Sequence, residues 1–136
     1  MRILISACLL GARCRYDGAS KLQPWISDLA ERHILVPVCP EQLGGLPTPR
    51  PPAERRGDVT AQYRRGAEEA LRLCRLLGCE AALLKERSPS CGSGMVYDGT
   101  FTGVLTAGEG VTAELLRAQG IPVYGESRVA ELADPI

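Results

Sequence analysis

The chain has 136 residues, of which 45% are hydrophobic and 24% are charged, and 16 basic residues balance 16 acidic ones. This size and composition are ordinary for a globular protein that buries its own core, so we expect one domain over residues 1–136. The neutral charge balance and the aromatic content of 4% argue against nucleic-acid binding, and no apolar run is long enough to cross a membrane.

Short apolar runs alternate with helical patterns along the chain. In chain order, strands are expected at residues 3–7, 34–38, 81–84 and 121–124, and helices after Pro24 and at about 60–78, 112–119 and 126–133. The Gly-rich stretch 92–110 is expected to contain a small hairpin. Pro37 and Pro122 indicate edge strands, because proline has no N–H for a central strand to donate. The alternation predicts a single-domain α/β fold with an open, mainly parallel, Rossmann-like sheet and flanking helices.

Cysteine is the most unusual part of the composition, with six residues: Cys8, Cys14, Cys39, Cys74, Cys79 and Cys91. The few residues before Cys8 are too short for the apolar region of a secretory signal, so we expect a cytoplasmic protein. Thiols stay reduced in that compartment, where several cysteines more often indicate metal binding or catalysis than disulfide bonds.

Three of these cysteines each follow an expected strand. Cys8 follows the first strand, Cys39 the second, and Cys91 lies a few residues beyond the third. Parallel strands end at the same sheet edge, where ligands of such folds bind, so the three thiols are expected to converge there as metal ligands. The alternative is that they are buried as small apolar residues.

The remaining cysteines and the single histidine have simpler interpretations. Cys74 lies on the apolar face of the long helix and Cys79 follows its end, so both are expected to pack structurally. Cys14 lies between two arginines and is interpreted as a loop cysteine. His33 is interpreted as a surface residue at a helix end. Because it is the single histidine of the chain, a Ser–His or Cys–His catalytic pair is not favoured.

Three thiolates suit an iron–sulfur cluster or a zinc ion. A four-iron cluster with three cysteine ligands keeps one iron open to substrate, whereas zinc would take a water as its fourth ligand. The cysteine spacing does not decide between them. A cysteine phosphatase is disfavoured, because its arginine would have to stand six residues after Cys8, where this chain has Cys14.

Three sequence blocks carry a resemblance to a known family: residues 6–18 (SACLLG and CRYDG), 38–50 (VCPEQLGGLPTPR) and 85–92 (KERSPSCG). They resemble, in the same order, a bacterial family long catalogued as a domain of unknown function, the thiouracil desulfidase-like family. The resemblance implies a [4Fe-4S] cluster bound by Cys8, Cys39 and Cys91. It also implies non-redox desulfuration of a thiolated pyrimidine such as 2- or 4-thiouracil, in which substrate sulfur binds the open iron and leaves as sulfide.

Such chemistry needs a base for water and groups that hold a polar ring. Glu41, two residues after Cys39, is the candidate base; Ser88 is a candidate hydrogen-bond or proton-relay residue, and Arg50 a candidate substrate-binding residue. Residues 85–87 (KER) are interpreted as a surface charge run. The expected partner is a small thiolated nucleobase, with no nucleic acid and no membrane. A non-catalytic iron–sulfur carrier or sensor and a zinc-dependent hydrolase with the same cysteines remain the alternatives.

Overall fold

The centre of the molecule is a four-stranded parallel sheet. The computed structural model describes residues 1–13, 22–46, 48, 60–86, 95–97, 105–107 and 110–132. The strand order is β2-β1-β3-β6, with these bounds: β1 Arg2–Ser6, β2 Ile34–Val38, β3 Ala81–Leu84 and β6 Val123–Gly125. The predicted open, parallel α/β sheet is therefore confirmed, and all four expected strands form within two residues of their expected starts.

Burial follows the position of each strand in the sheet. Every residue of β3 is buried, as are the last four of β1, because helices cover both faces of these central strands. Pro37 pairs with Ile5 from the edge strand β2, where its missing N–H costs the least. Pro122 immediately precedes β6, the strand at the other edge. Both prolines thus mark edge strands, as predicted.

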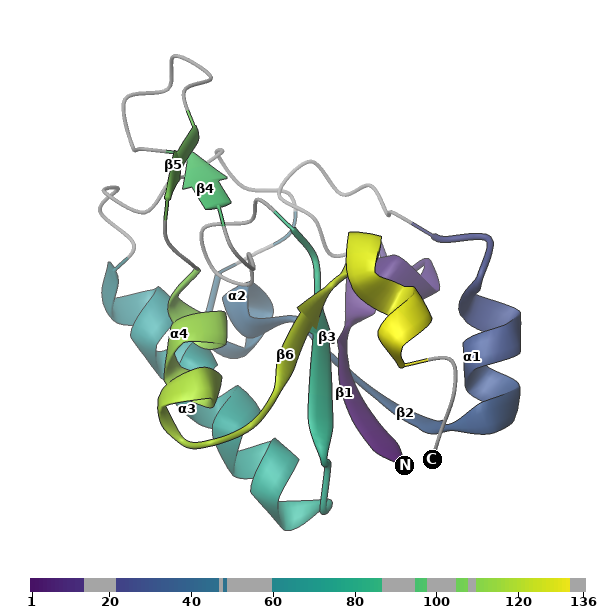
Figure 1. The fold of residues 1–136 in the computed structure, drawn as a ribbon. Helices are drawn as coiled ribbons and strands as arrows, with labels where there is room; N and C mark the ends of the chain where they lie inside the picture. The colour runs from purple at the N-terminus through teal and green to yellow at the C-terminus, as the bar shows by residue number, and fades with distance from the viewer. Residues whose placement is uncertain are drawn as a thin grey trace.

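The helices form a layer on each side of the sheet (Figure 1). Their bounds are α1 Ile26–Arg32, α2 Pro40–Leu43, α3 Thr60–Leu76 and α4 Val111–Ala118, with 3₁₀ helices η1 at Ala7–Leu10 and η2 at Glu126–Glu131. α3 and α4 lie on one face of the sheet, and α1 and η2 lie on the other. No helix in the described part of the chain is both long and apolar enough to span a bilayer.

Strand alternation divides the core into two clusters. Leu4 and Leu84 point to the face covered by α3 and α4, where they meet Ala70 and Leu116. Their neighbours in the strands point to the opposite face and form the second cluster: Ile3, Ile5, Ala81 and Leu83, with Leu9, Leu29 and Leu132. This period of two is what strands buried on both faces produce.

Chain reversals and short elements complete the fold. Gly78 (φ +67°) ends α3 and Gly120 (φ +82°) ends α4, in the left-handed conformation that favours glycine. The expected hairpin is formed by β4 (Met95–Tyr97) and β5 (Leu105–Ala107), which pair antiparallel. The last expected helix is the 3₁₀ helix η2 and not an α-helix. The four-residue helix α2 was not predicted, because it is too short to show a period.

Candidate functional site at the carboxyl edge of the sheet

The carboxyl ends of the four strands form a single row of residues. Ser6 of β1 is opposite Val38 of β2, and Leu84 of β3 is opposite Gly125 of β6. The pair Ile5–Leu83 brings Ser6 and Leu84 level across the two central strands. The next row therefore runs along the sheet edge in the order Cys39, Ala7, Lys85, Glu126.

Cys8 lies one residue beyond this row, in the 3₁₀ helix η1. The helix turns the chain back as soon as β1 ends, and Gly11 (φ +98°) closes it with a hydrogen bond from its N–H to the Cys8 carbonyl at 3.1 Å. Ala12 adds a hydrogen bond to the Ala7 carbonyl at 3.2 Å. Cys8 is only 8% exposed, so its thiol is held in a fixed turn at the edge of the second core cluster.

Cys39 directly follows β2 and lies in the row itself. Its extended backbone (φ −123°) is the N-cap of α2, and its carbonyl accepts a hydrogen bond from Leu43 N–H at 2.9 Å. Pro40 occupies the first helical position, where its fixed φ suits the helix and its missing N–H costs nothing. Cys39 is half-buried and packs against the same apolar cluster that contains Cys8. The structure thus brings these two thiols to one edge and one face of the sheet.

Two glycines hold the Cys39 turn against the long helix α3. A Cβ atom on Gly66 of α3 would lie 1.8 Å from the Pro40 carbonyl oxygen, and one on Gly44 would lie 1.9 Å from the Gln62 carbonyl oxygen. Backbone therefore meets backbone at two points between α2 and α3, a contact that no other residue type permits without movement. The sequence signal for this contact is a glycine inside a helical pattern, which does not by itself indicate what packs against it.

Glu41 lies in the first turn of α2, two residues from Cys39, and is half-buried. Its carbonyl accepts a hydrogen bond from Leu46 N–H at 3.0 Å, so the whole α2 turn is closed upon itself. The candidate base and one candidate ligand therefore share a single rigid turn. Cys91, Ser88, Arg50 and Cys14 lie outside the described residues.

None of the four described cysteines forms a disulfide bond. The described residues contain no group of three or more His, Cys, Asp or Glu side chains that could hold a metal ion. Cys8 and Cys39 supply two thiols, which are the soft type of ligand that both iron–sulfur clusters and zinc accept. The donor chemistry therefore fits a thiolate-bound metal centre, and the third expected ligand, Cys91, lies in an undescribed segment.

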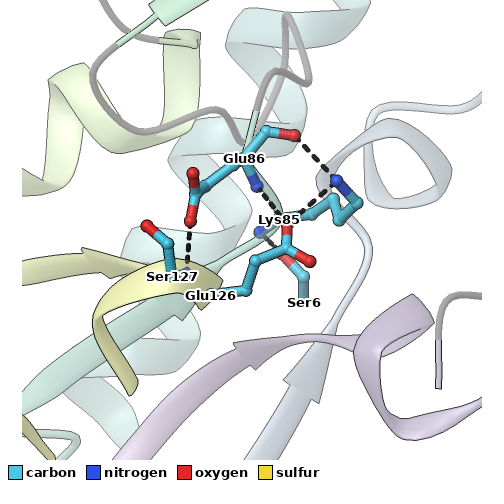
Figure 2. A network of polar contacts seen from close by, with 5 residues as sticks. All are labelled: Ser6, Lys85, Glu86, Glu126 and Ser127. Carbon is cyan, nitrogen blue, oxygen red and sulfur yellow. Dashed lines mark hydrogen bonds and ion pairs between the residues drawn. The ribbon is translucent and has the colours of Figure 1, made fainter. Parts of the chain in front are cut away.

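The expectation that residues 85–87 form a surface charge run is wrong for Lys85 and Glu86. Both are half-buried, and Figure 2 shows them in a polar network with Glu126 and Ser127 at the start of η2 and with Ser6 at the end of β1. The Lys85 ammonium is 2.9 Å from Glu126 Oε1, and the side chains are 22% and 19% exposed. The sequence does not indicate this network, because only the pairing of β3 with β6 brings Lys85 and Glu126 together.

The surface assignment of His33 is also wrong. This residue is 5% exposed, and its Nε2 donates to the Leu132 carbonyl at 2.6 Å while Nδ1 lies 3.4 Å from the Met1 amino group. Its ring lies at the amino edge of the sheet, beside an open cavity of about 580 Å³ that includes Met1, Arg2, Ile34 and Glu80. His33 is therefore a buried structural residue at the amino edge of the sheet, whereas Cys8 and Cys39 lie at the carboxyl edge.

These features define a class of protein: an open parallel α/β fold that presents cysteine thiols from neighbouring strands at its carboxyl edge. The model of the 2-thiouracil desulfurase family matches residues 3–128, and the chain belongs to this family. The family resemblance of the three sequence blocks is therefore confirmed.

Two similar proteins extend the comparison. The chain is 40% identical over 149 residues to the uncharacterized protein YbbK of Bacillus subtilis (strain 168), with 96% of this chain and 99% of YbbK covered. The solved structure of the [4Fe-4S]-dependent thiouracil desulfidase TudS superposes with a TM-score of 0.90 at 52% identity. That match covers 97% of this chain and 95% of TudS, so the two folds agree over nearly their full length.

Proposed function

We propose that this protein is a [4Fe-4S]-dependent desulfidase that removes sulfur from a thiolated pyrimidine without a redox change. The observation that carries the proposal is the convergence of Cys8 and Cys39 at one sheet edge, in a chain 52% identical to a [4Fe-4S]-dependent thiouracil desulfidase. We further propose that residues 1–136 act as a single cluster-binding domain, and that the protein works in the cytoplasm on a small thiolated nucleobase.

The proposed ligands are the thiolates of Cys8, Cys39 and Cys91. The first two leave β1 and β2, and Cys91 lies seven residues beyond the end of β3, the strand on the other side of β1. A four-iron cluster with three protein ligands supplies one iron atom as a Lewis acid for the substrate sulfur. The protein contributes the fixed η1 and α2 turns, which hold the first two sulfur atoms before the metal binds.

The proposed base is Glu41. Water adds to the carbon that carries sulfur, and the Glu41 carboxylate accepts the proton that this water loses. The C–S bond then breaks, so that the thione and one water become a carbonyl compound and hydrogen sulfide. Glu41 and Cys39 belong to the same turn, and α2 lies against α3 through the close backbone contacts at Gly44 and Gly66. Ser88 is proposed to hydrogen-bond the substrate or relay a proton, and Arg50 to orient the pyrimidine ring.

The deciding experiment is anaerobic reconstitution followed by metal analysis and an activity assay. We expect about four iron and four sulfide per chain, with a brown protein that fades in air, as a cluster with three protein ligands should. The reconstituted protein should release sulfide from 2- or 4-thiouracil and form uracil. About one zinc and no iron per chain would instead favour a zinc hydrolase. A stable cluster without turnover of any thiolated pyrimidine would favour the carrier or sensor.

A further inference from the structure

The end of β3 is fastened to the start of η2 by a reciprocal set of contacts, which we call the edge clamp and define as Lys85, Glu86, Glu126 and Ser127. Glu126 Oε1 accepts hydrogen bonds from the Glu86 N–H at 3.0 Å and from the Lys85 ammonium at 2.9 Å. In return, Glu86 Oε1 accepts a hydrogen bond from the Ser127 N–H. Each glutamate carboxylate therefore accepts a backbone N–H from the segment that follows the other strand (Figure 2).

These contacts pair backbone groups at the ends of the strands with side chains from other elements. The N-cap residue of η2 is Gly125, which provides no side-chain cap. Instead, the carboxylate of Glu86, which lies beyond the end of β3, accepts a hydrogen bond from the Ser127 N–H in the first turn of η2. Lys85 donates its N–H to Ser6 Oγ at 2.9 Å and its ammonium to the Glu86 carbonyl at 3.0 Å. Contacts that involve the charged groups of Lys85, Glu86 and Glu126 thus join the ends of β3 and β6, and charge-assisted hydrogen bonds are about twice as strong as neutral ones. The link to the end of β1 is the neutral hydrogen bond from the Lys85 N–H to Ser6.

The backbone next to the clamp is shaped to admit it. A Cβ atom on Gly125 would lie 2.5 Å from Glu86 Cγ, so a larger residue at the end of β6 would displace the Glu86 side chain from its present position. Lys85 and Glu126 are about one-fifth exposed, a partly buried environment in which an ion pair fixes geometry more than an exposed pair does. Half-buried charges, exchanged backbone contacts and a glycine beside the Glu86 side chain are more than a solvated strand end needs.

The clamp lies in the same row of the sheet edge as the proposed cluster site. That row runs Cys39, Ala7, Lys85, Glu126, and Cys8 follows Ala7 directly. The chain leaves the clamp at Glu86 and reaches Ser88 after two residues and Cys91 after five. The clamp is therefore the last described anchor before two of the proposed site residues.

We propose that the edge clamp is a positioning device for the segment that carries Cys91, and that it sets how firmly this third ligand holds the cluster. Lys85, Glu86 and Glu126 are positioning residues in this proposal, and none of them is a ligand or a catalytic residue. The proposal rests on the proposed function, because it requires that Cys91 binds iron. Residues that orient a metal ligand commonly change metal affinity by 10- to 100-fold when they are replaced.

The test compares how fast reconstituted variants lose iron to a chelator under anaerobic conditions. Glu126→Ala removes both contacts of the clamp carboxylate, and we expect iron loss at least about tenfold faster than in the wild type. Glu126→Gln keeps an oxygen that accepts the Glu86 N–H and should recover part of this difference. Lys85→Met keeps that hydrogen bond too and should give a smaller acceleration, which provides a second variant if Glu126→Ala folds poorly.

Two controls separate positioning from general stability. Glu131→Ala removes a glutamate of the same helix η2, but one whose carboxylate pairs with Arg128 at a surface where both side chains are about half exposed. Ile3→Val lowers the stability of the buried core away from the carboxyl edge. Both should lose iron at the wild-type rate, with the unfolding temperature of each apo-protein measured alongside.

The outcomes distinguish the two proposals. If the wild type binds iron and Glu126→Ala loses it no faster than the wild type, or no faster than a core variant of equal unfolding temperature, the positioning role is wrong and the proposed function stands. If the wild type takes up no iron at all, the proposed function fails and the positioning role fails with it. Three results together support the clamp. Glu126→Ala loses iron faster than the wild type, Glu126→Gln recovers part of the difference, and Glu131→Ala loses iron at the wild-type rate.

Discussion

The described part of the chain contains two pairs of cysteines that lie in very different settings. Cys8 and Cys39 are far apart in the sequence and come together only because β1 and β2 are parallel neighbours. Cys74 and Cys79 are five residues apart at the end of one helix, where the Cys79 N–H donates to the Cys74 carbonyl at 2.9 Å. The first pair is held by the topology of the sheet and the second by a local helix end.

The chemical difference between the pairs follows from these settings. Burial, reinforced by the neighbouring Cys79, raises the pKa of the Cys74 thiol to about 11, and burial also raises the pKa of Cys79. The Cys74 thiol lies 3.7 Å from the Cys79 carbonyl and is 1% exposed within the core cluster under α3. A neutral, buried thiol is a poor metal ligand. The closely spaced pair is therefore not part of the proposed ligand set.

Replacing the edge thiols should have the largest effect. Cys8→Ser, Cys39→Ser and Cys91→Ser should each lose the iron–sulfur absorption and all sulfide release, because a cluster with two thiolates has no stable coordination. Iron and sulfide analysis after anaerobic reconstitution measures this. Cys79→Ser and Cys74→Ser are the matched controls and should keep a full complement of iron. Normal iron content in any edge variant would remove that residue from the ligand set.

Glu41→Gln should separate turnover from metal binding within the Cys39 turn. The amide has nearly the same volume but cannot accept a proton, so sulfide release should slow by roughly a hundredfold or more. Iron content should match the wild type, because Glu41 is not a proposed ligand. The measurement is sulfide release from 2- and 4-thiouracil at equal iron content. Wild-type turnover in this variant would show that Glu41 is not the base.

Gly66→Ala tests how the Cys39 turn is held. In an open helix position, this substitution stabilises a protein by about 0.5–1 kcal/mol. At Gly66 the new methyl group would meet the Pro40 carbonyl oxygen, so we expect destabilisation by about 1–3 kcal/mol instead. Urea unfolding of the apo-protein measures whether the free energy of unfolding rises or falls. An increase in the free energy of unfolding would mean that α2 moves away from α3 at no cost.

The buried helix-end thiol should give the smallest effect, confined to alkaline pH. The pKa of Cys74 is raised in the folded state, so its contribution to stability is complete below the unfolded-state pKa of about 9 and is lost as pH rises toward 11. The free energy of unfolding should therefore fall by about 1–2 kcal/mol more in the wild type than in Cys74→Ala over that range. Parallel pH profiles of the two proteins would contradict this.

The fold was largely predictable because its strands contain short apolar runs that alternate with helical patterns. β3 is four buried residues in succession, and β2 carries its edge signal in Pro37. The placement of Cys8 and Cys39 at one edge follows from the parallel topology alone. These features depend on local sequence and on one general rule of strand order.

What the sequence did not indicate depends on pairs that meet only in three dimensions. His33 is buried because Leu132, 99 residues away, accepts its Nε2–H. Lys85 is paired because β6 places Glu126 beside it. Gly66 is required because an unpredicted helix, α2, packs against it. Each of these residues looks like an ordinary surface or helix residue until its partner is known.

The proline in the middle of β2 also affects how copies of the protein behave toward one another. An edge strand offers unpaired backbone groups on which a strand of another molecule can add, and this is a common start of aggregation. Pro37 has no N–H to offer, so a continuous ladder cannot extend across the outer side of β2. The exposed Ile34 lies in this same strand, where Pro37 interrupts strand addition. Pro37→Val restores the missing N–H, so it should increase self-association at high protein concentration.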